Sequence, residues 1–319
     1  MKISPRSFFV IQLLSCSLMW SSGFLFMKLL ADSVDPFAIA SVRAGFAAVI
    51  LSGWFVVRGL SPLPKRFELV PWLVLGTLNG WLPNVLTAYA LQSAPAGPSA
   101  MIQASGPLMV AVLSHFAFVD ERLTVRKIGG ILLGFAGMMV LIGPSALDHH
   151  GASLFGALAM VVVSMCYALG NVYAKFIPQV EPSRMALGQQ MVSATMATGL
   201  TFVVSGGSAY APILPSWSAA LGLSLFSTAL PITIFMYMIR QQGPTKAAMI
   251  GYLMPTFATL LAVLFLGESI GLREVIGGLV VLAGVFVVTT APHAHSSSLR
   301  ANAKQGREYG ASRSLLPDD

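Results

Sequence analysis

Long apolar stretches recur along most of this chain, and they constrain its fold more than any other feature. Charged residues make up only 10% of the 319 residues and hydrophobic residues 55%, whereas a soluble protein carries about a quarter charged residues. Too few charged side chains are present to cover a soluble core of this size. The composition therefore excludes a water-soluble globular enzyme and predicts an integral membrane protein.

Each stretch is long enough to cross the hydrocarbon layer as a helix, which takes roughly 20 residues. The first stretch follows Lys2 and Arg6 and has no small-residue cleavage site, so we interpret it as a retained span and not as a signal peptide. The ten predicted spans are residues 8–30, 36–57, 69–91, 96–118, 125–142, 153–177, 184–206, 217–239, 245–266 and 271–290.

Lysine and arginine residues in the connections predict the orientation of the chain, because cytoplasmic loops are enriched in them. With the N-terminus inside, only Lys28 and Arg273 fall at outer ends. Both termini are therefore expected in the cytoplasm, and a bacterial inner membrane is the expected location. The net charge of +7 is spread over these connections, which argues against a nucleic-acid partner. The inner basic residues are Lys2, Arg6, Arg58, Lys65, Arg66, Arg122, Arg126, Lys127, Lys175, Arg184, Arg240, Lys246, Arg300, Lys304, Arg307 and Arg313.

The second half of the chain repeats features of the first at an offset of 146 to 148 residues. Each half holds five spans, and two copies of an odd-span unit must lie in the membrane with opposite orientation, which is the inverted-repeat plan of secondary transporters. The matched features are Gly23 and Lys28 with Gly170 and Lys175, Asp35-Pro36 with Glu181-Pro182, Pro83 with Pro231, Gly97-Pro98-Ser99 with Gly243-Pro244-Thr245, Pro107 with Pro255, Glu121 with Glu268, and Gly129-Gly130 with Gly277-Gly278.

The predicted fold is an all-α integral membrane protein with ten transmembrane helices, arranged as two inverted five-helix repeats. The C-terminal tail has almost no large apolar residues, so it cannot bury enough surface to fold. The predicted segments are a cytoplasmic N-terminus at 1–7, a first repeat at 8–144, a linker at 145–152, a second repeat at 153–290 and a disordered cytoplasmic tail at 291–319.

Several stretches of sequence carry a resemblance to a known family. They are the segment from Trp20 to Lys28, Arg43 in the next span, and the runs ALQSAPAGPSAMIQASGPLMVAVL and DERLTVRKIGGILLGFAGMMVLIGP, which recur as GPTKAAMIGYLMPTFATLLAVLFLGESIGLREVIGGLVVLAGV. In these residues the chain resembles the paired EamA domains of the drug/metabolite transporter superfamily, over essentially residues 8–290. The resemblance implies a transporter of amino acids, other small metabolites or amphiphilic compounds, commonly directed outward.

Prolines interrupt the third and fourth spans of each half. A proline has no N–H and frees the carbonyl four residues earlier, which then needs another partner. Interrupted spans at matching positions of two halves point to the binding site of a transporter, whereas kinks for packing are the alternative explanation for any single proline. The pairs of proline and freed carbonyl are Pro83 with Asn79, Pro107 with Gln103, Pro231 with Ser227, and Pro255 with Gly251.

Arg43 is the basic residue inside a predicted span, about 10 Å below its outer end at 1.5 Å per residue. Burying an arginine there costs about 2.5 to 3.5 kcal/mol unless something compensates. Apart from Glu274 near the start of the last one, no Asp or Glu lies inside a predicted span. The partner of Arg43 is therefore a carbonyl, a loop acid such as Asp32 or Asp35, or a substrate carboxylate. A structural role is favoured, and the matching positions of the second half are Gln189 and Gln190.

Polar and aromatic residues inside the spans could line a substrate cavity. For each Tyr or Trp, a position in the membrane interface or a helix contact is the more common role. His115 could carry a proton near neutral pH or simply hydrogen-bond a neighbouring helix. Glu121 and Glu268 lie at span ends and look like loop charges or partners at helix ends for nearby arginines. The cavity candidates are Trp20, Arg43, Asn79, Asn84, Tyr89, Gln103, Ser105, Asn171, Gln190, Tyr237 and Tyr252.

The leading functional hypothesis is a secondary transporter that exports a small organic metabolite, such as an amino acid or another zwitterionic or neutral compound, by rocking of two five-helix bundles. An exporter of drugs or amphiphiles is the alternative. An intramembrane enzyme is more remote, because the spans contain no nucleophile motif or metal cluster. A receptor is also more remote, because we expect ten spans and no output domain. The expected partners are the substrate and the bilayer, with a homodimer left open, and we expect no cofactor and no metal. The fifth and tenth spans are expected at a contact between repeats or protomers.

Overall fold

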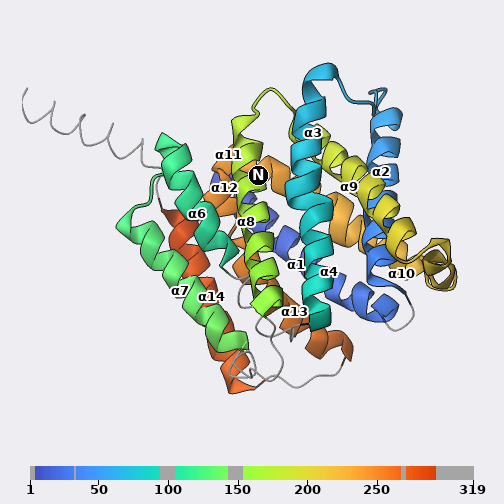
Figure 1. Ribbon diagram of the computed structural model, residues 1–319. Helices are drawn as coiled ribbons and strands as arrows, with labels where there is room; N and C mark the ends of the chain where they lie inside the picture. Colours follow the sequence, from blue (N-terminus) through green and yellow to red (C-terminus); the bar gives the residue numbers. More distant parts are fainter. Residues whose placement is uncertain (1–3, 32–33, 94–104, 143–153, 267–270, 292–319) are drawn as a thin grey trace, which may run out of the picture.

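The computed structural model of the protein describes residues 4–31, 34–93, 105–142, 154–266 and 271–291. All regular structure in these residues is helical (Figure 1). The first half contains α1 (Pro5–Ala31), α2 (Pro36–Val57), η1 (Arg66–Glu68), α3 (Leu69–Gly76), η2 (Thr77–Trp81), α4 (Leu82–Ser93), α6 (Gly106–Ala117), η3 (Val119–Glu121) and α7 (Val125–Ile142). The second half contains α8 (Leu154–Phe176), α9 (Pro182–Val204), η5 (Gly207–Ile213), α10 (Trp217–Ser224), η6 (Leu225–Ala229), α11 (Leu230–Gln242), α12 (Pro244–Ala247), α13 (Ile250–Leu266) and α14 (Leu272–Thr290).

The helices agree with the predicted spans, and the predicted all-α fold of two repeats is confirmed. The first part of the fourth predicted span lies outside the described residues. Proline at the first helical position marks the start of both α2 and α9. By length and composition alone, four helical stretches of the described residues could cross a membrane. They are Pro36–Val57, Arg66–Thr87, Leu158–Phe176 and Trp217–Gln242.

Helices of the two halves are interleaved. The first helix of each half packs mainly against the third and fourth spans of the other half: α1 contacts α10, α11 and α13, and α8 contacts α4 and α6. The second helices, α2 and α9, pack against each other. The expectation of two separate five-helix bundles is therefore wrong. The helices group into units that each combine both repeats, because α1 and α8 each pack against helices of the opposite half.

The last helices of the two halves, α7 and α14, run side by side along one edge of the molecule (Figure 1). Glycines bring their backbones into direct contact. A Cβ atom added to Gly284 would lie 2.4 Å from the backbone nitrogen of Gly134, and one added to Gly137 would lie 2.6 Å from that of Val281. The fifth and tenth spans thus form a contact between the two repeats, one of the two positions expected for them.

Candidate functional site

The third span of each half contains one wide helical turn just before its proline. The turns are η2 and η6, and both have π-helical geometry. Pro83 and Pro231 lie in the first turn of the helices that follow. Because proline has no N–H, the normal hydrogen bond to the carbonyl four residues earlier is lost, and a widened turn takes its place. At Gly80 the backbone leaves the helical region altogether, with φ −119° and ψ −110°.

Both freed carbonyls find their partners on the second span of the opposite half. The amide Nε2 of Gln189 on α9 donates to the Asn79 carbonyl at 3.0 Å. The guanidinium Nη2 of Arg43 on α2 donates to the Ser227 carbonyl at 3.0 Å. Arg43 and Gln189 are seven residues past the prolines that start their helices, so they are equivalent positions of the repeat. One interaction is thus made twice, once by an arginine and once by a neutral glutamine.

The first span of each half passes directly over the wide turn of the other half. A Cβ atom on Gly170 of α8 would lie 2.1 Å from Oδ1 of Asn79, and one on Gly23 of α1 would lie 2.2 Å from Oγ of Ser227. Asn79 also donates from Nδ2 to Oδ1 of Asn171 at 3.1 Å, and both asparagines are buried. The two equivalent glycines therefore allow polar side chains of η2 and η6 to be enclosed between helices.

Arg43 completes its contacts with η6 through Nε, which donates to Oγ1 of Thr228 at 2.7 Å. Of the partners that the sequence left open, a backbone carbonyl is the one observed. No acidic residue pairs with Arg43 among the described residues. The side chain interacts electrostatically with Tyr167 of α8, a residue that the sequence analysis missed. Tyr167 is the repeat equivalent of Trp20, and that correspondence could have identified it.

Trp20 lies near the same turn, since its carbonyl accepts a hydrogen bond from Oγ of Ser227 at 3.3 Å. Its ring meets Phe235 edge to face, with 5.1 Å between the ring centroids. Together these contacts bring Trp20, Arg43, Asn79 and Asn171, four of the predicted cavity residues, to the region where α1, α2, α8 and α9 pack on η2 and η6.

The other predicted residues lie elsewhere. The Tyr237 hydroxyl donates to Oε1 of Glu181 at 3.1 Å near the end of α11, and Tyr252 is fully buried against Gly134 of α7. His115 accepts the N–H of Leu123 at Nδ1, 3.0 Å away, and so holds the turn after α6. The remaining candidates are placed as follows: Asn84 half-buried on α4, Ser105 just before α6, Gln190 buried on α9, Pro107 in the first turn of α6, Pro255 inside α13, and Gln103 and the Tyr89 side chain outside the described residues.

One end of the helix bundle carries most of the basic residues and is called the basic face here; it includes Arg58, Lys65, Arg66, Arg122, Arg126, Lys175, Arg184 and Arg240. Glu121 belongs to this end, where it is not a loop charge but pairs with lysines near helix ends, although the expected partner was an arginine. It is 1% exposed, and its carboxylate lies 3.4 Å from Nζ of Lys175 and 3.8 Å from Nζ of Lys127. The turn η3 folds the carboxylate inward against Gly243, where no side chain stands in its way.

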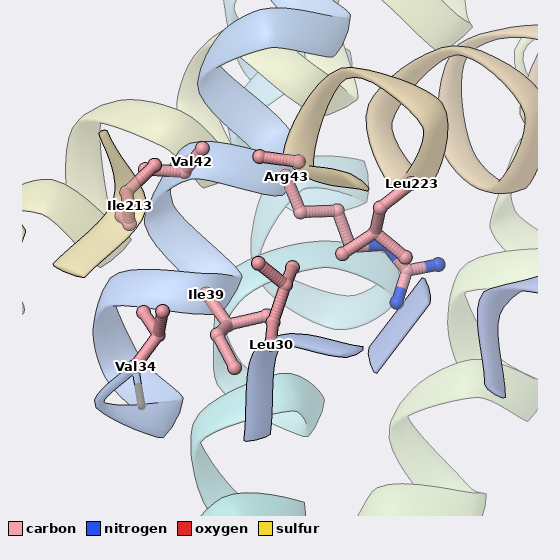
Figure 2. Close-up of a pocket in the computed structure, with 8 residues that line it drawn as sticks. Leu30, Val34, Ile39, Val42, Arg43, Ile213 and Leu223 are labelled. Atoms are coloured by element: carbon pink, nitrogen blue, oxygen red, sulfur yellow. The ribbon is translucent and has the colours of Figure 1, made fainter. Parts of the chain in front are cut away.

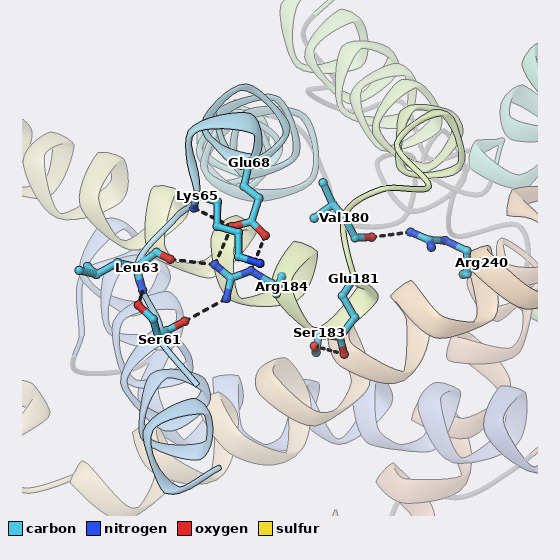
Figure 3. A network of polar contacts seen from close by, with 9 residues as sticks. All are labelled: Ser61, Leu63, Lys65, Glu68, Val180, Glu181, Ser183, Arg184 and Arg240. Carbon is cyan, nitrogen blue, oxygen red and sulfur yellow. Dashed lines mark hydrogen bonds and ion pairs between the residues drawn. The ribbon is translucent and has the colours of Figure 1, made fainter. Parts of the chain in front are cut away.

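A second network on the basic face joins the connection between α2 and α3 to the start of α9 (Figure 3). Arg184 forms a two-point ion pair with Glu68 and donates to the carbonyls of Ser61 at 2.9 Å and Leu63 at 2.8 Å. Arg240 of α11 donates to carbonyls of the α8–α9 connection, including Pro178 at 2.8 Å. These contacts hold the helix ends of the basic face together.

The described residues leave hollows at the basic face and between α1, α2, η5 and α10. One, of about 300 Å³, opens at the basic face and includes Lys65, Glu181 and Arg184 in its lining. The other is a narrow apolar crevice between α1, α2, η5 and α10, with no room for a water molecule (Figure 2). Arg43 and Leu223 lie at one end of this crevice and Val34 and Ile213 at the other.

The repeated architecture corresponds to a known family. Residues 7–143 match the sequence model of the EamA-like transporter family, and residues 154–290 match it a second time. The chain belongs to the EamA-like transporter family. An EamA-like protein of this kind is a multi-pass integral membrane transporter and not an enzyme.

Relatives of this EamA-like chain span most of its length. It is 28% identical over 287 residues to a WAT1-related chloroplastic protein of Arabidopsis thaliana, and this alignment covers 86% of this chain and 68% of the relative. It is 28% identical over 278 residues to the inner membrane transporter YedA of Escherichia coli K12, and the alignment covers 85% of this chain and 87% of YedA. It is 23% identical over 279 residues to the transporter YoaV of Bacillus subtilis, and the alignment covers 87% of this chain and 95% of YoaV. A crystal structure aligns with a TM-score of 0.76 at 19% identity, over 89% of this chain and 96% of that one, and so shares the fold.

Proposed function

We propose that this EamA-like protein is a secondary transporter that exports a small organic metabolite by alternating access. Its substrate is an amino acid or a similar zwitterionic or neutral compound. It works in a bacterial inner membrane with both termini in the cytoplasm, an orientation supported by the excess of basic residues at the basic face and by the location of the relative YedA.

The pair of wide turns is the observation that carries this proposal. Transporters of inverted-repeat design bind substrates where interrupted helices meet between the repeats, because free backbone groups and polar side chains are available there. The protein has such a turn at η2 and at η6, with Asn79 and Asn171 at one and Ser227, Thr228 and Arg43 at the other. Amides and hydroxyls suit the polar groups of an uncharged or zwitterionic molecule.

The interleaved packing suggests which parts move. One unit contains α1 with α10, α11 and α13, and the other contains α8 with α4 and α6. The contacts of Arg240 with the α8–α9 connection and of Glu121 with Gly243 join the two units at the basic face. Opening toward the cytoplasm would break both, whereas the contact between α7 and α14 could persist in either state.

An exporter of lipophilic cations is supported less well. Such proteins usually place an acidic residue within the membrane to meet the positive charge of the substrate. The charged residue at the wide turns of this protein is Arg43, and no acidic side chain contacts it among the residues described. A cation at η6 would therefore meet repulsion.

Flux measurements in proteoliposomes test the proposal. We expect saturable uptake and counterflow of at least one compound from a labelled amino-acid panel, and about tenfold weaker flux in Asn79→Ala, because a buried hydrogen bond at the wide turn is lost. Gln241→Ala, an exposed change on α11, serves as the matched control and should transport normally. Acceleration by an imposed pH gradient would show proton coupling. Absence of flux for the whole panel, or equal flux in Asn79→Ala, would contradict the proposal.

A further inference from the structure

The hollow at the basic face is lined by two opposite charges that do not pair with each other. Lys65 comes from the connection between α2 and α3, and Glu181 from the connection between α8 and α9 (Figure 3). Neither residue belongs to an ion pair in the part of the chain that the structure describes. Arg184 also lines the hollow, but Glu68 already matches its charge. One ammonium and one carboxylate are thus left for a ligand.

The carboxylate of Glu181 is available because it does not cap the helix that follows it. Its repeat equivalent, Asp35, caps α2 by accepting two backbone N–H groups, whereas Glu181 makes no such contact with α9. Its Oε1 accepts instead from the hydroxyls of Ser183 at 2.7 Å and Tyr237 at 3.1 Å. Oε2 makes no hydrogen bond to any residue that the structure describes. The carboxylate is therefore held in place by one oxygen and can bind a cation with the other.

The ammonium of Lys65 is available in the same way. The backbone N–H of this residue donates to Oε2 of Glu68 at 2.8 Å, which fixes the chain at this point. Nζ lies over the ring of Phe67, 5.9 Å from the centroid, and makes no hydrogen bond within the described residues. Its three N–H donors therefore remain for the acceptor oxygens of an anion.

The rest of the hollow is mainly apolar and small. Leu60, Leu63 and Pro64 line it beyond the end of α2. Since α2 has 22 residues and can cross the hydrocarbon layer by itself, this connection lies outside that layer. The volume of about 300 Å³ is at the lower limit of ligand pockets. These properties suit a small solute with a short aliphatic group better than a lipid with long chains.

We propose that this hollow binds a free aliphatic α-amino acid before transport, with its carboxylate at Nζ of Lys65 and its ammonium at Oε2 of Glu181. The aliphatic side chain lies against Leu60 and Leu63. A zwitterion satisfies both charges at once, whereas an amine or a carboxylate alone leaves one of them unmatched. This inference rests on the proposed transport function, and it names the place where the protein takes its substrate from the cytoplasm.

Three probes with the same branched chain test the proposal on the purified full-length protein. Leucine has both charges, 4-methylpentanoate lacks the ammonium, and 3-methylbutylamine lacks the carboxylate. Saturation-transfer NMR suits the weak binding of exposed charges, since each such pair changes affinity by up to about fivefold. We expect leucine to bind about threefold or more tightly than either other probe. Equal binding of leucine and a probe with one charge would overturn the proposal, and so would the absence of leucine binding. Tighter binding of glycerophosphoethanolamine than of leucine would overturn it in favour of a lipid headgroup.

Two variants assign each charge to its part of the ligand. In Glu181→Gln, leucine should bind no better than 4-methylpentanoate, and in Lys65→Gln no better than 3-methylbutylamine. Arg66→Gln is the matched control, because Arg66 is exposed beside Lys65 but does not line the hollow; it should bind leucine as the unchanged protein does. If leucine keeps its advantage in both variants, the site is refuted. Leucine binding without flux of any amino acid would count against the proposed transport function alone, and amino-acid flux without leucine binding at the hollow would count against this site alone.

Discussion

Gly170 is the position where a single methyl group should be most informative. In Gly170→Ala the new Cβ would lie 2.1 Å from Oδ1, 2.6 Å from Cγ and 3.0 Å from Nδ2 of Asn79, so the whole amide must move. Overpacking of this kind costs about 1 to 3 kcal/mol. Losing the Asn79–Asn171 hydrogen bond in a buried place costs about 1 to 3 kcal/mol more. Alanine returns about 1 kcal/mol of helix propensity. The net expectation is a loss of about 1 to 5 kcal/mol of stability.

Reversible denaturation in mixed detergent micelles measures this loss, with Gly45→Ala as the matched control. Gly45 lies in α2, and an added Cβ there would have no neighbour within 4 Å. Gly45→Ala should therefore be neutral or slightly stabilising. Because the clash involves one side chain, Gly170→Ala combined with Asn79→Ala should be more stable than the sum of the two single changes predicts. If Gly170→Ala proves as stable as Gly45→Ala, or if the two changes simply add, the close packing of α8 on η2 is refuted.

Two further predictions concern buried polar groups. Gln189→Met should lower the free energy of unfolding by about 1 to 3 kcal/mol, because it leaves the Asn79 carbonyl without a partner. Gln190→Met should lower it less. Thermal denaturation of both variants checks this order, and the reverse order would show that Gln190 holds the turn. Glu121→Gln should cost about 3 kcal/mol or more, because it removes the buried anion beside Lys127 and Lys175. Glu181→Gln, a change at an exposed acid, is the comparison, and similar melting temperatures for the two variants would count against the buried ion pair.

The sequence predicted the breaks in the helices but not their partners. Pro83 and Pro231 locate the wide turns because the loss of an N–H is a local property of the chain. The sequence also restricted the partner of Arg43 to three kinds of group. Which carbonyl it reaches depends on how α2 packs against the other half, and that is set by contacts between residues far apart in sequence. The repeat offset nevertheless carried this information, since it pairs Arg43 with Gln189 and Asn79 with Ser227.

Residues near helix ends and on alternative helix faces were harder to place. Glu121 follows an apolar run and is itself charged, so an exposed position was the natural expectation; its burial depends on the fold of η3 and on the bare backbone at Gly243. Tyr252 and Tyr237 lie on spans that do contribute to the central region. Their side chains point to α7 and to Glu181 instead, because the rotation of a helix about its axis is decided by its neighbours and not by its own composition.

The exchange of helices between the halves has a consequence for synthesis. When the ribosome has completed α7, the first half is in the membrane, yet α1 still lacks α10, α11 and α13, and α4 and α6 still lack α8. The early product must therefore wait in the bilayer with its polar turn at η2 uncovered until the second half is inserted. We expect the two halves, cut between residues 143 and 153 and produced from separate messages, to be degraded alone and to assemble together.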